Sequence, residues 1–136
     1  MTDIRDHEIA HREFFKTALG SNAIPALEVD FSSVNFANRA SVLGTAKAFE
    51  DLGVSAYNGA GKLLADVNNL LIAGKIVSVE ARHAALIREL LTPNSFGASD
   101  VVNSNGLDLA RSPQEVLSIA DPYLKSKLNA ANLPTS

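Results

Sequence analysis

The stretch Ser78-Val79-Glu80-Ala81-Arg82-His83-Ala84-Ala85-Leu86-Ile87-Arg88 decides the fold of this chain. It lies in a segment whose positions on one face recur at steps of three and four residues, the spacing of a helix packed in a bundle. Six positions recur on this face between Ala73 and Leu90. Four of them are apolar, and the two in the middle are a carboxylate and an imidazole. The spacing predicts a helix over about 68–91 whose buried face is formed by Ala73, Ile76, Glu80, His83, Ile87 and Leu90.

An acid and a histidine on a buried face need partners. Leaving a charge buried and unpaired costs on the order of several kcal/mol. Glu80 and His83 are three residues apart, so they lie one turn apart on the same side of the helix. Both side chains can therefore reach one point inside a bundle, where a bound ion or a polar network would satisfy them.

The same motif occurs near the N-terminus. A helix predicted over 2–19 carries Glu8 and His11 in the middle of its apolar face, again three residues apart, and ends at Gly20 with Pro25 beyond. Two of the three histidines of the chain thus follow a glutamate at the same spacing. The third, His7, falls off this face, and we expect it to be solvated. The expected buried face is Ile4, Glu8, His11, Phe15 and Ala18.

A third carboxylate lies on a helix predicted over about 36–64, which follows a connection long enough to cross a bundle. Glu50 lies 16 residues before the turn at Asp66 and Glu80 lies 14 after it. In an antiparallel hairpin their heights differ by only ~3 Å. Gly53, one turn after Glu50, is expected to allow close packing there. The expected buried face is Leu43, Ala46, Glu50, Gly53, Tyr57, Ala60 and Leu64.

The rest of the chain completes one domain over 1–136. Residues 94–112 contain turn dipeptides and are predicted to form a loop. Ser112 is a helix N-cap followed by proline, so short C-terminal helices are expected through Ala120 and from Asp121, within 94–131. With few strand patterns elsewhere, the sequence predicts an all-α protein.

Composition excludes several classes of protein. A net charge of −3 without a basic patch argues against a nucleic-acid partner. The absence of cysteine excludes disulfides and cysteine-ligated metals. No apolar run is long enough to span a membrane. The polar start, Met1 to Asp6, lacks the pattern of a signal peptide, so a cytoplasmic location is the default expectation and the compartment stays open.

These motifs carry a family resemblance. Glu8-x-x-His11, Glu50 within Phe49-Glu50-Asp51-Leu52-Gly53-Val54-Ser55-Ala56-Tyr57, and Glu80-x-x-His83 resemble the ferritin-like superfamily. In particular they resemble the bacterial ferritin-like domain family that includes desiccation-related proteins. The resemblance covers about 2–91, and 112–124 resembles the C-terminal segment of that family. It implies an up-down helical bundle with a crossover around a carboxylate-bridged di-metal centre.

The resemblance also implies roles for individual residues. Glu8 and Glu80 would bridge two ions, His11 and His83 would bind one each, and Glu50 would be a terminal carboxylate. Carboxylates with imidazoles suit iron or manganese, and zinc could compete. Ferroxidase activity, peroxide dismutation and O₂ activation are all compatible with two such ions.

Tyr57 is a further candidate near this site. It lies two turns from Glu50 on the same face and could be a redox-active residue or a partner of the ligands. An ordinary aromatic core residue is the favoured interpretation of it. Phe14, Phe15 and Phe49 are likewise expected in the core.

The chain departs from the family pattern at its start. The family's bundle opens with one more helix, carrying another glutamate, and here Met1 stands directly before the first Glu-x-x-His helix. The chain could be a fragment, a second copy could fill the slot, or the C-terminal helices could fold back and bring Glu115 to it. A homodimer that completes the bundle is the favoured reading, because a three-helix remnant exposes a large apolar groove.

A metal-free alternative stays open. The three glutamates and two histidines could form a buried salt-bridge network with Arg82 or Arg88, which are otherwise expected on the surface. The protein would then be a structural, stress-protection or interaction module with a relic site. A network of this kind is poorly balanced, because the carboxylates repel each other and one arginine cannot pair all of them.

Overall fold

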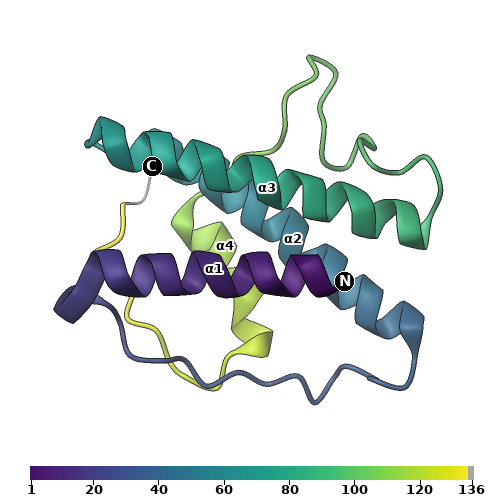
Figure 1. The fold of residues 1–136 in the computed structure, drawn as a ribbon, viewed down its shortest axis with the longest axis horizontal. Helices are drawn as coiled ribbons and strands as arrows, with labels where there is room; N and C mark the ends of the chain where they lie inside the picture. Colours follow the sequence, from purple (N-terminus) through teal and green to yellow (C-terminus); the bar gives the residue numbers. More distant parts are fainter. Residues whose placement is uncertain (135–136) are drawn as a thin grey trace.

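The computed structural model describes residues 1–134 and shows a helical bundle with one long crossover (Figure 1). The predicted all-α class is confirmed: residues 1–134 form helices, loops and two isolated β-bridges, with no strand. No helix in this described part is long and apolar enough to cross a membrane. The elements are α1 (Thr2–Leu19), η1 (Gly20–Asn22), α2 (Arg39–Gly61), α3 (Val67–Leu91), α4 (Pro113–Ala120) and η2 (Asp121–Tyr123).

The three long helices have the up-down arrangement that the crossover predicts. Helices α1 and α2 run in the same direction, and α3 returns antiparallel to α2 (Figure 1). The bounds of α1 coincide with the predicted 2–19, and α3 begins one residue before the predicted 68. Helix α2 is three residues shorter at each end than the predicted 36–64. Its start is set by Asn38, whose side chain accepts a hydrogen bond from the Ser41 amide.

Helices α2 and α3 make the main packing interface of the molecule. Ile87 is fully buried and packs with Ile4 of α1 and Leu43 of α2. The buried residues of α3 include five of the six positions expected on its inner face, while Leu90 is 41% exposed. The apolar core thus lies at one end of α1, and the polar residues lie further along the same interface.

Arg88 departs from the expectation of a surface side chain. It is 3% exposed and is held between two carboxylates. Its Nε and Nη2 donate to Asp51 at 2.8 and 2.7 Å, and its Nη1 and Nη2 donate to Asp100 at 3.0 and 2.9 Å. Hydrogen bonds to Asp51 and then to Asp100 raise the pKa of the Arg88 guanidinium. The Arg88 guanidinium thus links Asp100, in the loop after α3, to Asp51 of α2 through paired hydrogen bonds.

The same loop meets α2 again near Gly59. The Arg111 amide donates to the Ser55 carbonyl at 2.9 Å, and Arg111 Nη1 donates to Ser55 Oγ at 2.6 Å. A Cβ at Gly59 would lie 1.8 Å from the Arg111 carbonyl oxygen. Gly53, expected to serve close packing, has no atom within 4 Å of such a position. The glycine that close packing requires is therefore Gly59.

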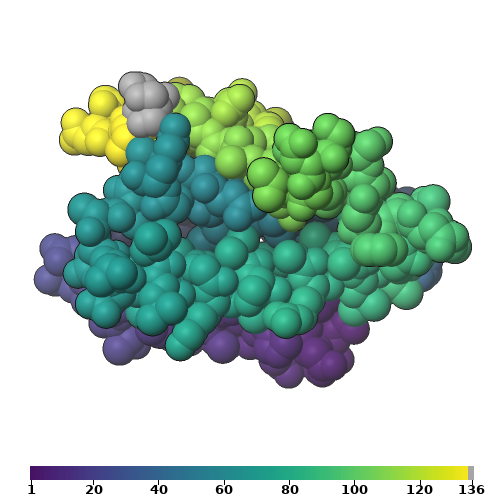
Figure 2. Space-filling view, turned by 90° about the horizontal axis from the view of Figure 1, so that it is seen from above, coloured from purple at the N-terminus to yellow at the C-terminus, as the bar shows by residue number. Residues whose placement is uncertain are grey.

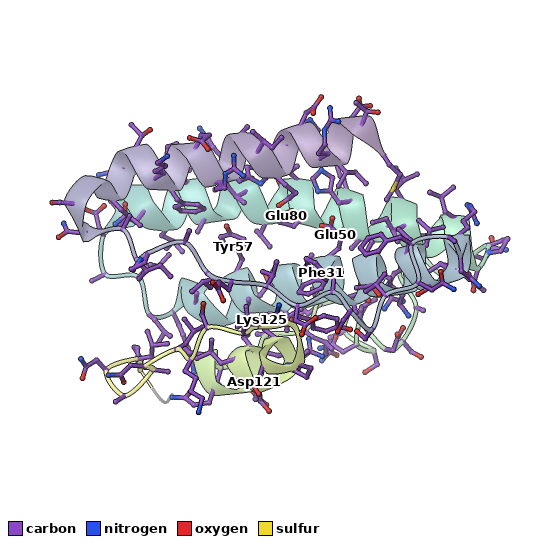
Figure 3. The ribbon with its side chains drawn as sticks, turned by 90° about the horizontal axis from the view of Figure 1, so that it is seen from below. Phe31, Glu50, Tyr57, Glu80, Asp121 and Lys125 are labelled. Atoms are coloured by element: carbon purple, nitrogen blue, oxygen red, sulfur yellow. The ribbon has the colours of Figure 1, made fainter. Side chains whose placement is uncertain are left out.

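The crossover is fastened to the C-terminal segment by aromatic contacts. Phe31 lies 6.0 Å from Phe49 of α2 and 6.2 Å from Tyr123, measured between ring centroids. Val29 and Leu124 form an antiparallel bridge beside this cluster. These contacts hold the crossover against α2 and the C-terminal segment, and Figure 3 shows the crossover running past α2 near the labelled Phe31.

Helix α4 packs against α2 on the side away from α1 (Figure 3). The Glu115 carboxylate accepts hydrogen bonds from the Ser112 amide and hydroxyl, at 2.7 and 2.8 Å, and closes a capping box. The alternative in which the C-terminal helices bring Glu115 into an open slot beside α1 is therefore wrong.

Helix α1 lies along one edge of the molecule (Figure 2), and several of its large apolar side chains are exposed. Ile4 is its one buried residue. Phe14 and Phe15, expected in the core, are 43% and 36% exposed. They line a mostly apolar groove of about 490 Å³, which we call the α1 groove, together with Ala18, Leu19, Tyr57, Ala60, Leu64, Asn69, Ile72 and Ala73.

Candidate metal centre

The three long helices bring the predicted site residues together. Helix α1 supplies Glu8 and His11, α2 supplies Glu50, and α3 supplies Glu80 and His83. We call these five residues the carboxylate–histidine cluster. One ligand atom from each of the cluster residues other than His11 lies within 4.8 Å of the others. Figure 3 shows Glu50 and Glu80 in the space between the three helices.

The Nδ1 atom of His83 is surrounded by carboxylate oxygens. It lies 3.1 Å from Glu8 Oε1, 3.3 Å from Glu80 Oε2 and 3.5 Å from Glu50 Oε2. A ring nitrogen has one proton or one lone pair, so it cannot satisfy three carboxylates. The side chain of His83 is 5% exposed, so water has little access to it. This convergence is typical of ligands that surround a cation.

His11 makes a second centre beside the first. Its Nδ1 lies 3.2 Å from Glu80 Oε1 and 3.8 Å from Glu8 Oε1. The two oxygens of Glu80 therefore face two different imidazoles. A carboxylate placed in this way can bridge two ions, and Glu8, which is near both imidazoles, can do the same.

Three atoms of this cluster are buried without a hydrogen-bond partner among residues 1–134: His11 Nδ1, Glu80 Oε2 and His83 Nδ1. Such atoms are rare, because each unpaired one costs about 1–3 kcal/mol. His83 Nδ1 lies 3.3 Å from Glu80 Oε2, His11 Nδ1 lies 3.2 Å from the other oxygen of Glu80, and all three are atoms of types that bind metals. With three carboxylates and two imidazoles, the donor set fits iron or manganese.

A family model described as a ferritin-like domain matches residues 1–93. The chain belongs to the ferritin-like family. The matched range contains all three long helices and every residue of the carboxylate–histidine cluster. No curated protein and no solved structure matched the chain.

Burial and neighbouring carboxylates make it costly for the acids of the cluster in this ferritin-like bundle to ionise. Burial, and then the charges of Glu8 and Asp51, raise the pKa of Glu50 to about 7. Burial and the Glu8 carboxylate raise the pKa of Glu80 to about 8. Burial lowers the pKa of His83, which disfavours an imidazolium that would neutralise the acids. A divalent cation would relieve this repulsion.

The arginines do not supply that positive charge. Arg88 is committed to Asp51 and Asp100. Arg82 is exposed and donates to the Ser78 carbonyl of its own helix at 3.0 Å. The salt-bridge network with arginine, which the sequence left open, is therefore not formed by either of these side chains.

Tyr57 lies beside the cluster and also lines the α1 groove (Figure 3). Burial, and then the charges of Glu80 and Glu8, raise the pKa of its hydroxyl to about 12. The phenol therefore stays protonated at neutral pH and can donate a hydrogen bond or a proton. A redox role for Tyr57 stays a prediction.

The sequence analysis missed His7. It was expected to point away from the buried face, but its Nδ1 lies 2.9 Å from His83 Nε2. The signal was the spacing of His7 and His11, which are four residues apart and so lie on one side of α1. A helix face wide enough to hold His11 and Glu8 also brings His7 to α3.

Proposed function

We propose that this ferritin-like chain binds two iron or manganese ions between α1, α2 and α3 and performs redox chemistry on O₂ or peroxide. The observation that carries the proposal is the set of three buried, unpartnered ligand atoms around the carboxylate of Glu80. Glu8 and Glu80 would bridge the ions, His11 and His83 would bind one each, and Glu50 would be a terminal ligand.

The chain's own residues have clear parts in this function. Glu80 holds the two positions as one unit, because its oxygens face different imidazoles. The bound ions would supply or accept the electrons that O₂ or peroxide exchanges. Tyr57 keeps a protonated hydroxyl beside the cluster. The side chain of Glu8 is 46% exposed, so small molecules would reach the site from the α1 side.

The α1 groove supports a homodimer as the state that covers it. Its lining includes Phe14, Phe15 and Leu19, which are 43%, 36% and 48% exposed. Exposed apolar patches of this kind mark association surfaces, and a second copy packed there would complete the bundle. Sedimentation of the wild type and of Phe15→Glu tests this, with a dimer expected for the wild type alone. Membership of the desiccation-related branch stays a prediction from the sequence.

The function is tested with a variant that removes the cluster's centre. Protein reconstituted anaerobically with Fe(II) or Mn(II) is exposed to O₂ or peroxide, and consumption is compared between the wild type and Glu80→Leu/His83→Leu. We expect the variant to stay folded, with a metal-free stability raised by roughly 1–4 kcal/mol, because buried charges are replaced by apolar groups. It should lose the metal-dependent reaction.

A matched control is Glu13→Leu, on the exposed side of α1, where the glutamate pairs with the exposed Arg12. It should react as the wild type does. Equal metal-dependent turnover in the wild type and the double variant would contradict the proposal. Stability indifferent to metals and chelators in the wild type would favour the metal-free structural or stress-protection module instead.

A further inference from the structure

One hydrogen bond joins two histidines from opposite helices. Nδ1 of His7 in α1 lies 2.9 Å from Nε2 of His83 in α3. Their rings are parallel to within 10°, with centroids 5.2 Å apart. His83 is the residue whose other nitrogen, Nδ1, lies among three carboxylates. His7 therefore contacts the candidate metal ligand from the side opposite to the site.

The ring geometry shows a well-directed hydrogen bond. A ring nitrogen lies roughly one covalent bond length from the centre of an imidazole. The centroid separation of 5.2 Å exceeds the nitrogen–nitrogen distance of 2.9 Å by about two such lengths. Both nitrogens must then lie close to the line between the ring centres. The two rings are thus nearly coplanar and meet edge to edge, with each nitrogen's in-plane bond or lone pair aimed at the other.

The contact allows the shared proton to lie on either of the two nitrogens, and metal binding selects one arrangement. In a neutral imidazole one nitrogen is a donor and the other an acceptor. A ligand must present its lone pair, so Nδ1 of His83 can bind a cation only when the proton is on Nε2. That proton needs an acceptor, since the side chain of His83 is 5% exposed. Nδ1 of His7 is the atom in position to accept it.

We propose that His7 is a positioning residue of the metal site. It accepts the Nε2 proton of His83 and so keeps the Nδ1 lone pair of His83 directed at Glu8, Glu50 and Glu80. The inference rests on the proposed function, because His7 can position a metal ligand only if His83 binds a metal ion. It also assigns a role to a residue outside both Glu-x-x-His motifs.

The position of His7 in the fold supports this role. Helix α1 has one buried residue, Ile4, so few apolar contacts fix its rotation against α3. His7 directly precedes Glu8, whose Oε1 lies 3.1 Å from the other nitrogen of His83. Consecutive residues of one helix turn thus flank the two nitrogens of the His83 imidazole, His7 at Nε2 and Glu8 at Nδ1. Its ring orientation and the distance between the helices are set together.

Two variants separate the acceptor atom from the ring. His7→Asn places a carbonyl oxygen at the same distance along the side chain as Nδ1, so it keeps an acceptor without the ring. His7→Phe keeps a flat ring without an acceptor. Arg12→Phe is the control, because the side chain of Arg12 is 69% exposed on the same helix.

The affinity for Mn(II) alone is the first measurement. Loss of a group that orients a metal-binding histidine weakens binding roughly 10–100-fold. We expect this loss in His7→Phe, with His7→Asn and Arg12→Phe close to the wild type. Equal loss in the Asn and Phe variants would overturn the proposal, since it would mean that His7 acts as a ligand or by packing.

The second measurement needs no metal. Nitrogen-15 NMR of the metal-free protein reports which nitrogen of His83 is protonated. At pH 6, where the carboxyls of Glu50 and Glu80 are largely protonated and can donate to Nδ1, we expect the Nε2–H form in the wild type and His7→Asn, and a loss of that preference in His7→Phe. An unchanged tautomer in His7→Phe would overturn the positioning role. If the wild type binds neither Mn(II) nor Fe(II), the proposed function fails, while the tautomer still tests the contact. If His7→Phe does not fold, the Asn variant and the wild-type tautomer decide.

Discussion

Nδ1 of His11 in α1 lies 3.2 Å from Oε1 of Glu80 in α3, across the interior of the bundle. The two residues are far apart in the sequence, separated by the crossover and helix α2, so the tertiary fold brings these atoms together. The other oxygen of Glu80 is turned toward a different imidazole. This division of one carboxylate between two histidines is the basis for expecting two metal positions.

Removing one histidine should therefore remove one ion. We expect His11→Leu to lower the Mn(II) stoichiometry from two ions per chain to one, because His83 and its three carboxylates stay in place. Titration followed by electron paramagnetic resonance measures the number and coupling of the ions. A variant that still binds two ions would contradict the assignment of His11, whereas Glu13→Leu should leave the count unchanged.

The affinity for metal should rise with pH. The pKa of Glu50 is raised to about 7 and that of Glu80 to about 8, so both carboxyls are largely protonated below these values. A cation must displace these protons. We expect proton release on Mn(II) binding at pH 6, and affinity that climbs until about pH 8. Calorimetry in buffers of different ionisation enthalpy measures it, and binding without proton release would refute the raised pKa values.

The stability of the metal-free protein should show the matching dependence. A carboxyl whose pKa is higher in the folded state stabilises the fold below its unfolded pKa of about 4.5. That contribution is lost as pH rises through the folded values, about 7 for Glu50 and about 8 for Glu80. The lowered pKa of His83 acts in the opposite sense below its ordinary value. Urea unfolding between pH 6 and 9 should show a decline that Glu80→Gln reduces.

Two glycines of α2 should respond in opposite directions to alanine. Gly59→Ala places a Cβ 1.8 Å from the Arg111 carbonyl oxygen, so the loop must move, at a cost of about 2 kcal/mol. Gly53→Ala meets no atom within 4 Å and should stabilise the helix by about 1 kcal/mol. Denaturant unfolding measures both. Equal effects would mean that the loop does not pack on α2 as described.

Arg88 should be among the most costly side chains to remove. Arg88→Met leaves the half-buried carboxylate of Asp51 without its buried partner, and we expect a loss of about 3 kcal/mol. The side chain of Asp100 is 58% exposed, so Asp100→Asn should cost far less. A double-mutant cycle between Arg88 and Asp51 isolates the pair. A coupling near zero would show that packing alone explains the loss.

The local pattern of the sequence predicts the helices and the inner face of α3 well. Capping residues and the steps of three and four are properties of a single helix, and Asp66 caps α3 as its position implies. The five cluster residues converge because each lies on the inner face of its own helix. Both results follow from periodicity, which needs no knowledge of the partner helix.

The remaining features depend on contacts between distant segments. His7 was missed because its partner is in α3, and the burial of Arg88 depends on Asp100 in the following loop. Phe14 and Phe15 fit a helix face, but in the described residues that face borders the open α1 groove. Periodicity predicts which residues share a face and leaves open what that face meets.

The most direct test of the central claim is the metal content of the reconstituted protein. Elemental mass spectrometry after anaerobic incubation with Fe(II) or Mn(II), followed by removal of free ions, gives the number of ions per chain. The account predicts close to two in the wild type and close to none in Glu80→Leu/His83→Leu. A wild type that retains no iron or manganese would contradict it and would leave the cluster a buried polar network.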